Sequence, residues 1–122
     1  MDWKERVKKF PKAMDAFCIS KFGGDVKKCM VNGKEDRFWG ALSLINDREL
    51  YDFFDGHGIF ITLKVVNGWD YTISDGKGHL LDTEYDYQDT RKEAETAAFM
   101  KAFKILEPKL KDGTTPVTLQ KV

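Results

Sequence analysis

The residues of this chain that could bind a metal are two histidines and a few nearby carboxylates. Asp55-Gly56-His57-Gly58, together with Asp52 and His79, offers nitrogen and oxygen ligands that zinc accepts. A zinc site needs three or four converging ligands, and no second histidine lies at helical or hairpin spacing from His57. In the segment 75–79, Lys77 and His79 stand where a calcium loop requires oxygen donors. The spacing therefore predicts neither a metal site nor a cofactor.

Cys18 and Cys29 are the candidate nucleophiles, with His57 or His79 as the base. Both cysteines lie within apolar helical patterns, where burial raises the pKa of a thiol and makes it inert. A disulfide between them stays open on the sequence, although a reducing compartment disfavours one. We therefore expect a protein that is not an enzyme.

The charges of the chain balance, because 20 lysines and arginines stand against 20 aspartates and glutamates. No global field that attracts nucleic acid or an anionic membrane is expected. The longest apolar runs are far too short to span a bilayer, and the N-terminus, Met1-Asp2-Trp3-Lys4-Glu5-Arg6, is charged and unlike a signal sequence. With 122 residues, 16 of them aromatic (nine Phe, four Tyr and three Trp), the chain can bury a core of its own. These features predict a single cytoplasmic domain over residues 1–122.

Residues 1–57 have the pattern of a series of short helices. Asp2 and Glu5 have the spacing of a capping box, Pro11 suits the first turn of a second helix, and Gly23-Gly24 stop that helix. One further turn is expected around residues 26–30, then a helix over residues 38–45, and then a short helix capped by Asn46 or Asp47. The apolar residues at helical spacing that predict these elements are Trp3, Val7, Phe10, Ala13, Met14, Phe17, Cys18, Phe22, Val26, Cys29, Met30, Phe38, Ala41, Leu42, Ile45, Leu50, Phe53 and Phe54.

Residues 58–107 are expected to form three antiparallel strands followed by one long helix. Matching the faces of the first two strands selects the turn between them. A two-residue loop at Asn67-Gly68 would mix apolar and polar residues on each face, whereas a three-residue loop, Val66-Asn67-Gly68 with Gly68 left-handed, keeps them apart. The predicted register pairs Val65 with Trp69, Leu63 with Tyr71 and Ile61 with Ile73.

The two faces of the sheet are expected to differ. The turn from Asp75 to Gly78 places Leu81, Tyr85 and Tyr87 on the apolar face. The closing helix covers that face after a capping box of Thr90 and Glu93, and residues 108–122 form a loop or tail. The fold class is α+β: N-terminal helices followed by a three-stranded antiparallel β-meander packed against one long C-terminal helix.

The start of the last helix, Thr90-Arg91-Lys92-Glu93-Ala94-Glu95-Thr96-Ala97-Ala98, resembles that of double-stranded-RNA-binding domains. In that family the basic pair contacts phosphates across a groove. The resemblance implies Arg91 and Lys92 as phosphate contacts, supported by Lys77 or Lys64. The tight turn at Asn67-Gly68 replaces the long loop that the family uses for a further contact. Nucleic-acid binding is the alternative function.

A second resemblance covers a longer stretch of the chain. Trp69-x-Tyr71-x-Ile73, Asp75-Gly76, Tyr85-x-Tyr87 and Thr90-Arg91-x-Glu93-Ala94-Glu95-x-Ala97 are similar to small uncharacterised proteins of gut bacteriophages and related mobile elements. Those proteins often end in a similar strand, strand, helix unit. The resemblance implies an origin in such an element and assigns no functional residues.

From these observations we expect a non-enzymatic accessory protein that acts by binding another protein. The predicted binding surface is the acidic outer face of the sheet, which could imitate nucleic acid toward a basic partner. An ordinary solvated sheet face is the alternative. The residues of the predicted surface are Phe60, Asp70, Asp82, Glu84 and Asp86.

Overall fold

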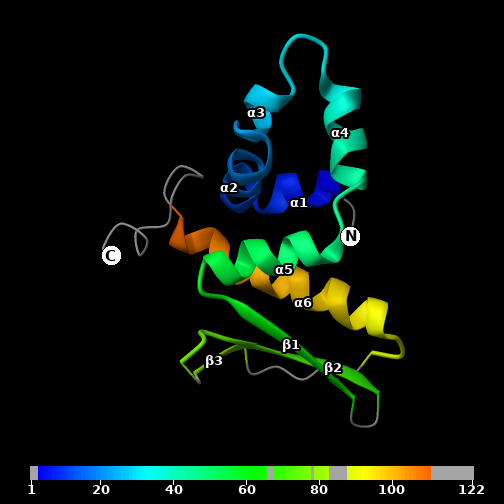
Figure 1. The fold of residues 1–122 in the computed structure, drawn as a ribbon, viewed down its shortest axis with the longest axis vertical. Helices are drawn as coiled ribbons and strands as arrows, with labels where there is room; N and C mark the ends of the chain where they lie inside the picture. The colour runs from blue at the N-terminus through cyan, green and yellow to red at the C-terminus, as the bar shows by residue number, and fades with distance from the viewer. Residues whose placement is uncertain (1–2, 66–67, 78, 83–87, 111–122) are drawn as a thin grey trace. The chain divides into compact units, whose positions relative to one another are not determined.

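The computed structural model describes residues 3–65, 68–77, 79–82 and 88–110 (Figure 1). Helices and one three-stranded antiparallel sheet make up the described chain, which confirms the α+β class. Two compact units can be distinguished: unit 1 consists of the described residues of Met1–Asp47 and Leu106–Val122, and unit 2 of those of Arg48–Ile105. The helix before the sheet thus groups with the sheet and not with the preceding helices, while the expected single domain stays a prediction.

Unit 1 consists of short helices whose ends follow from the local sequence. Pro11 occupies the first turn of the second helix, and Gly23 ends that helix with a left-handed φ of 85°. Asp25 caps the third helix, since its Oδ1 accepts a hydrogen bond from the Lys28 N–H at 2.8 Å. These helices confirm the predicted ones, although Asp2 of the expected capping box lies outside the described residues. The elements of unit 1 are α1 (Trp3–Lys9), α2 (Pro11–Phe22), α3 (Val26–Cys29), α4 (Glu35–Ser43) and the 3-10 turn η1 (Glu107–Lys109).

The core of unit 1 is built around α2, which packs against α1, α3 and η1. Trp3 of α1 stacks on Phe17 of α2 with 5.8 Å between the ring centroids. Burial of each large apolar side chain stabilises the unit by about 1.5–3 kcal/mol. The buried apolar residues of its helices are Ala13, Met14, Ala16, Phe17, Cys18, Val26, Phe38 and Leu42.

Glu107 of η1 caps α2 from a distant part of the sequence. Its carboxylate oxygens accept hydrogen bonds from the backbone N–H groups of Lys12 and Ala13, at 3.1 and 2.8 Å. Phe10, the residue before α2, makes no side-chain cap. The long-range contact therefore satisfies helix N–H groups that the local sequence leaves open.

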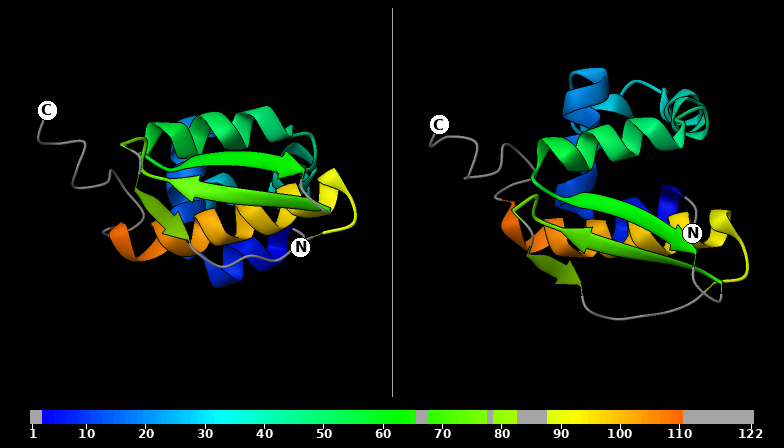
Figure 2. Two further views of the ribbon diagram at one scale, coloured as in Figure 1. Left: turned by 90° about the horizontal axis from the view of Figure 1, so that it is seen from below. Right: turned by 60° about the horizontal axis from the view of Figure 1, so that its bottom comes forward.

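Unit 2 contains the sheet and two helices. The first residue of the one helix, Asp47, and the last residue of the other, Leu106, are assigned to unit 1. The sheet has the order β1-β2-β3, and both pairs of neighbouring strands are antiparallel. Figures 1 and 2 show α5 and α6 on the same side of the sheet. The elements are α5 (Asp47–Gly56), β1 (Phe60–Val65), β2 (Trp69–Ser74), β3 (Leu80–Asp82) and α6 (Arg91–Leu106).

The predicted register of the first hairpin is confirmed. Val65 pairs with Trp69, Leu63 with Tyr71 and Ile61 with Ile73. Gly68 at the end of the three-residue loop has a φ of 133°, a region that favours glycine. Residues 66 and 67 lie outside the described residues.

The core of unit 2 is rich in aromatic rings. Phe54 of α5 contacts two rings of α6, Phe99 at 6.3 Å and Phe103 at 4.9 Å between centroids. The Tyr51 hydroxyl donates a hydrogen bond to Glu95 Oε2 at 3.1 Å, which pairs a buried carboxylate. Small residues on α6 allow close approach, as the sequence pattern indicates. The other buried residues of the unit include Leu50, Phe53, Ile59, Tyr71, Ile73, Ala94, Ala98 and Ala102.

The third strand joins β2 through a bulge. Ser74 pairs with Leu80 and Ile73 with Asp82, so that one extra residue, Leu81, stands in β3. Tyr85 and Tyr87, which we expected on the apolar face, lie outside the described residues.

Candidate binding site

The prediction that Asp70 lies on an exposed acidic face of the sheet is wrong. Its side chain is 0% exposed, on the middle strand of the sheet. Asp70 Oδ1 accepts the Tyr71 N–H at 2.7 Å, and Oδ2 lies 3.9 Å from the amino nitrogen of Lys64, its partner across the strands. The alternation of side chains along β2 predicts which face a residue occupies, but not how far neighbouring chain covers that face. Asp70 is therefore unavailable to a partner.

Of the other residues of that predicted face, only Phe60 has a side chain that the structure describes. Phe60 is 36% exposed, and its ring lies against Gly76, where a Cβ atom would stand 2.5 Å from a ring carbon. For Asp82 the strand register is described but the side chain is not, and Glu84 and Asp86 lie outside the described residues. Phe60 thus supports the neighbouring turn and is only partly available for binding.

The predicted phosphate contacts fall at two ends of the sheet. Arg91 and Lys92 are exposed in the first turn of α6, and Gln88 shortly before them bridges to Trp69 at the start of β2. Lys77 follows the opposite end of that strand, so roughly 20 Å of strand separates it from the bridge. The three cations therefore do not converge on one patch.

The start of α6 has the predicted capping box. The Thr90 Oγ1 accepts the Glu93 N–H at 3.1 Å, and Glu93 Oε1 accepts the Thr90 N–H at 3.1 Å. The Thr90-x-x-Glu93 part of the motif is thus explained by helix capping alone. Capping leaves the two basic residues between them, Arg91 and Lys92, without this explanation.

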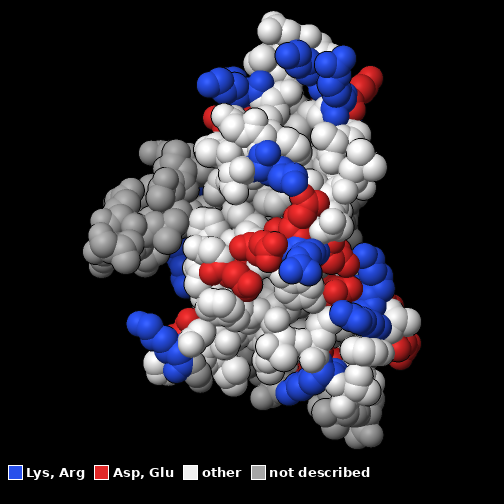
Figure 3. All heavy atoms as spheres, in the orientation of Figure 1, with Lys and Arg blue, Asp and Glu red and all other residues white. Residues whose placement is uncertain are grey.

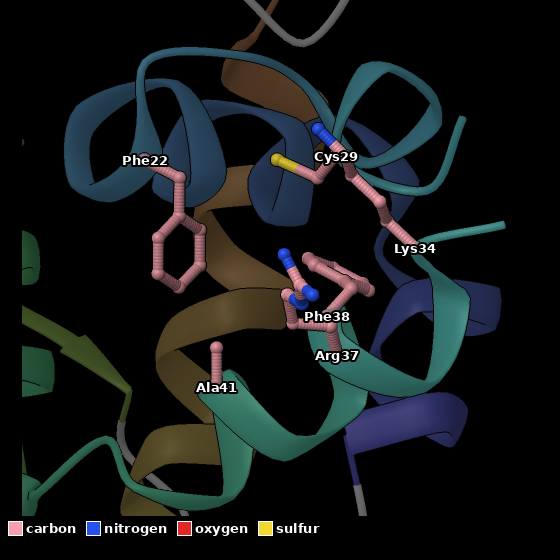
Figure 4. Close-up of a pocket in the computed structure, with 6 residues that line it drawn as sticks. All are labelled: Phe22, Cys29, Lys34, Arg37, Phe38 and Ala41. Carbon is pink, nitrogen blue, oxygen red and sulfur yellow. The ribbon is translucent and has the colours of Figure 1, made fainter. Parts of the chain in front are cut away.

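A hollow that the sequence did not predict lies in unit 1, between α2 and α4 (Figure 4). Its volume is about 180 Å³ and its wall is almost entirely apolar. Figure 4 shows the side chains of Phe22, Phe38 and Arg37 pointing toward it from α2 and α4. The two rings meet edge to face, 6.3 Å apart. We call this site the apolar hollow; its lining residues are Phe22, Cys29, Lys34, Arg37, Phe38 and Ala41.

A second hollow of about 240 Å³ adjoins the first and shares Phe22, Cys29 and Lys34 with it. Its further lining residues are Gly23, Gly24 and Lys28. We call it the polar hollow, because the backbone of the turn after α2 and two lysines form much of its wall. Neither hollow is lined by an acidic residue.

Basic side chains surround the two hollows. Lys28, Lys34 and Arg37 are exposed, and no ion pair joins any of them to another described residue. Figure 3 shows Lys and Arg side chains gathered over the end of unit 1 formed by α3 and α4, and acidic side chains gathered over α5 in unit 2. The apolar hollow thus combines an apolar wall with a positive edge.

The two cysteines are thiols that remain protonated. Burial, with smaller contributions from the nearby Cys29 and Asp15, raises the pKa of Cys18 to about 12. Burial also raises the pKa of Cys29, whose thiol donates a hydrogen bond to the Gly24 carbonyl at 3.4 Å. Cys18 is a buried core residue as expected, whereas Cys29 also lines both hollows. The arrangement provides no thiolate nucleophile and contributes a neutral wall.

The histidines and carboxylates also have structural surroundings. His57 packs against the Phe53 ring at 4.7 Å, and burial lowers its pKa. The His79 Nδ1 lies 2.9 Å from Asp75 Oδ2. Among the described residues, no group of three or more His, Cys, Asp or Glu side chains is placed to hold a metal ion.

One feature of the sequence could have pointed to the apolar hollow. Met14, Cys18 and Phe22 follow one another at steps of four, so the apolar stripe of α2 extends to its last residue. Because Gly23 ends the helix there, little chain remains to cover the final ring, which is 39% exposed. Lys34 and Arg37 carried no comparable signal, since single basic residues near a helix start are ordinary surface residues.

The fold and the hollow define an α+β protein with a candidate site for an apolar group. No protein-family model, no curated protein and no solved structure matches the chain. No helix among the described residues is long and apolar enough to cross a membrane.

Proposed function

We propose that this chain is a non-catalytic binding protein whose partner is another protein, and that the apolar hollow of unit 1 receives an anchoring side chain of that partner. The hollow itself is the observation that carries the proposal. An origin in a bacteriophage or mobile element remains an expectation from sequence resemblance and adds no residue to the site.

The size of the hollow supports a side chain as the ligand. Sites for cofactors and drug-sized molecules occupy about 300–1,000 Å³, and the apolar hollow holds about 180 Å³. Protein interfaces, in contrast, are commonly anchored by a single aromatic or aliphatic side chain in a small pocket. The exposed apolar residues of unit 1, Ile19, Phe22, Val31 and Leu44, add apolar area from which a contact surface can be built.

The test is binding to a library of short random peptides, with the protein intact and in two matched variants. Ala41→Phe places a ring in the hollow, and Ser43→Phe places the same ring on an exposed position of the same helix. We expect peptides selected by the wild-type protein to bind Ser43→Phe equally well and to lose binding to Ala41→Phe. Equal binding to both variants, with both folded by circular dichroism, would show that the hollow is not the site.

A second candidate is binding of double-stranded nucleic acid by Arg91 and Lys92. The exposure of both side chains in the first turn of α6 supports it. A gel-shift series with double-stranded RNA and DNA at rising salt tests this candidate, because phosphate contacts weaken as counterions compete. A band that is retarded at low salt and lost in Arg91→Gln is the expected result, and no retarded band at any salt eliminates the candidate.

A further inference from the structure

We propose that the two hollows of unit 1 together bind the C-terminal residue of a protein chain, with its apolar side chain in the apolar hollow and its carboxylate in the polar hollow. This inference rests on the proposed function and names the chemistry of the partner. The ligand that it specifies is a peptide end that combines one large apolar side chain with a free α-carboxylate.

The arrangement of the hollows matches that of such a residue. The side chain and the carboxylate of a C-terminal residue branch from the same Cα atom, so their sites must adjoin. The apolar and polar hollows share Phe22, Cys29 and Lys34, and therefore lie directly side by side. An unbranched fatty acid carries its carboxylate at the far end of the apolar chain and does not require two adjoining sites of this kind.

The charges favour a carboxylate. Lys34 lines both hollows, Lys28 lines the polar hollow and Arg37 lines the apolar hollow. Two carboxylates oppose them: Asp25, which caps α3, and Asp15 both add to burial in raising the pKa of Cys29 in the wall of the hollows, but neither lines a hollow itself. Hydrogen bonds from ammonium or guanidinium groups to carboxylates are about twice as strong as neutral ones, and arginine can make two at once.

The stem of Lys28 passes close to Gly24 beside the polar hollow. A Cβ atom at position 24 would stand 3.1 Å from Lys28 Cδ and 3.3 Å from its Cβ. The aliphatic stem of Lys28 therefore packs over Gly24, and its amino group lies at the end of that stem. The Cys29 thiol is protonated and already bonded to the Gly24 carbonyl, so it presents no charge that would repel the ligand.

The experiment uses three hexapeptides with one N-terminal fluorophore and one internal sequence, measured by fluorescence anisotropy with the full chain. The first ends in Phe with a free carboxylate, the second in Phe amide, and the third in Gly with a free carboxylate. Because the label is common to all three, its own contribution cancels. We expect the Phe acid to bind about tenfold or more tightly than either of the others.

Protein variants assign the carboxylate to its cations. Lys34→Gln and Arg37→Gln each remove one positive charge from the hollows, and Lys27→Gln removes one from an exposed position on α3 that lines neither. We expect Lys34→Gln and Arg37→Gln to weaken binding of the Phe acid several-fold and to leave binding of the Phe amide unchanged. Lys27→Gln should change the affinity for neither peptide. Unfolding midpoints establish that the variants are folded.

The outcomes separate this inference from the proposed function. Equal binding of the Phe acid and the Phe amide overturns the carboxylate site and leaves the apolar hollow as an anchor site. Failure of both Phe peptides to bind also overturns the inference. If the peptide library shows no dependence on Ala41→Phe in addition, the proposed function fails with it.

Discussion

Units 1 and 2 use their aromatic residues in different ways. In unit 2 the rings of Phe54, Phe99 and Phe103 are at most 2% exposed, and Phe54 of α5 contacts both rings of α6. In unit 1 the Phe38 ring is 4% exposed, but its neighbour Phe22 is 39% exposed and lines a hollow. The rings between α5 and α6 are thus buried for the stability of unit 2, whereas the Phe22 ring of unit 1 leaves apolar area beside a hollow that a partner can cover.

The largest expected difference between the units is the cost of removing a ring. Phe54→Ala should lower the free energy of unfolding by about 3–5 kcal/mol, because it removes a fully buried ring and leaves a cavity. Phe22→Ala should cost about 1 kcal/mol or less, since much of its ring already contacts water. Urea unfolding of both variants measures the two values. Equal losses would mean that Phe22 is a core residue and would remove the contrast.

A smaller effect is expected at the cap of α2 in unit 1. Glu107→Ala removes the acceptor of the Lys12 and Ala13 N–H groups and should destabilise the chain by about 1 kcal/mol. Lys109→Ala, at an exposed position of the same 3-10 turn, is the matched control and should be nearly neutral. The measurement is again urea unfolding, and a neutral Glu107→Ala would show that water satisfies the helix end equally well.

Local signals predicted the fold well, and long-range packing determined what they missed. Face matching selected the register of β1 and β2, and Pro11 with Gly23 set the bounds of α2. The burial of Asp70 did not follow from its position in the alternating pattern, because the coverage of a face depends on chain distant in sequence.

The candidate site shows the same limit. The apolar hollow is lined by Phe22 at the end of α2 and by Phe38 of α4, whose rings meet edge to face and whose residue numbers differ by 16. Sequence periodicity predicts that each ring faces inward on its own helix, but not the distance between the two helices at that level. That Arg37 lines a hollow likewise follows only from the packing of these two helices.

The pH dependence of unfolding should report on the half-buried imidazole of His57 in unit 2. Burial lowers the pKa of His57 in the folded chain, so the unfolded chain takes up this proton more readily. The neutral His57 therefore contributes its full share to the free energy of unfolding above about pH 6.5, and this share declines as the pH falls below that value. Thermal unfolding between about pH 7 and pH 5 should therefore show a shallower pH dependence for His57→Gln than for the wild type. Identical slopes would mean that His57 reaches water in the folded state.

The smallest expected effect concerns the exposed turn after β2. Asp75 Oδ1 accepts the N–H groups of Lys77 and His79, at 2.8 and 3.1 Å, and Oδ2 lies 2.9 Å from the His79 ring. The hydrogen bond from the Lys77 N–H, followed by those from His79, lowers the pKa of Asp75 from 3.8 to about 2.

Because the folded pKa of Asp75 is depressed, its carboxylate stabilises the fold above about pH 4, and this contribution is lost as the pH falls toward 2. Asp75→Asn keeps an acceptor for the backbone but loses the charge. We expect its unfolding temperature to lie slightly below that of the wild type at about pH 5 and to meet it near pH 2. A constant difference in unfolding temperature between the two proteins over this range would show that the charge of Asp75 does not stabilise the turn. The turn would then be stabilised by Gly76 and by the Phe60 ring packed against it.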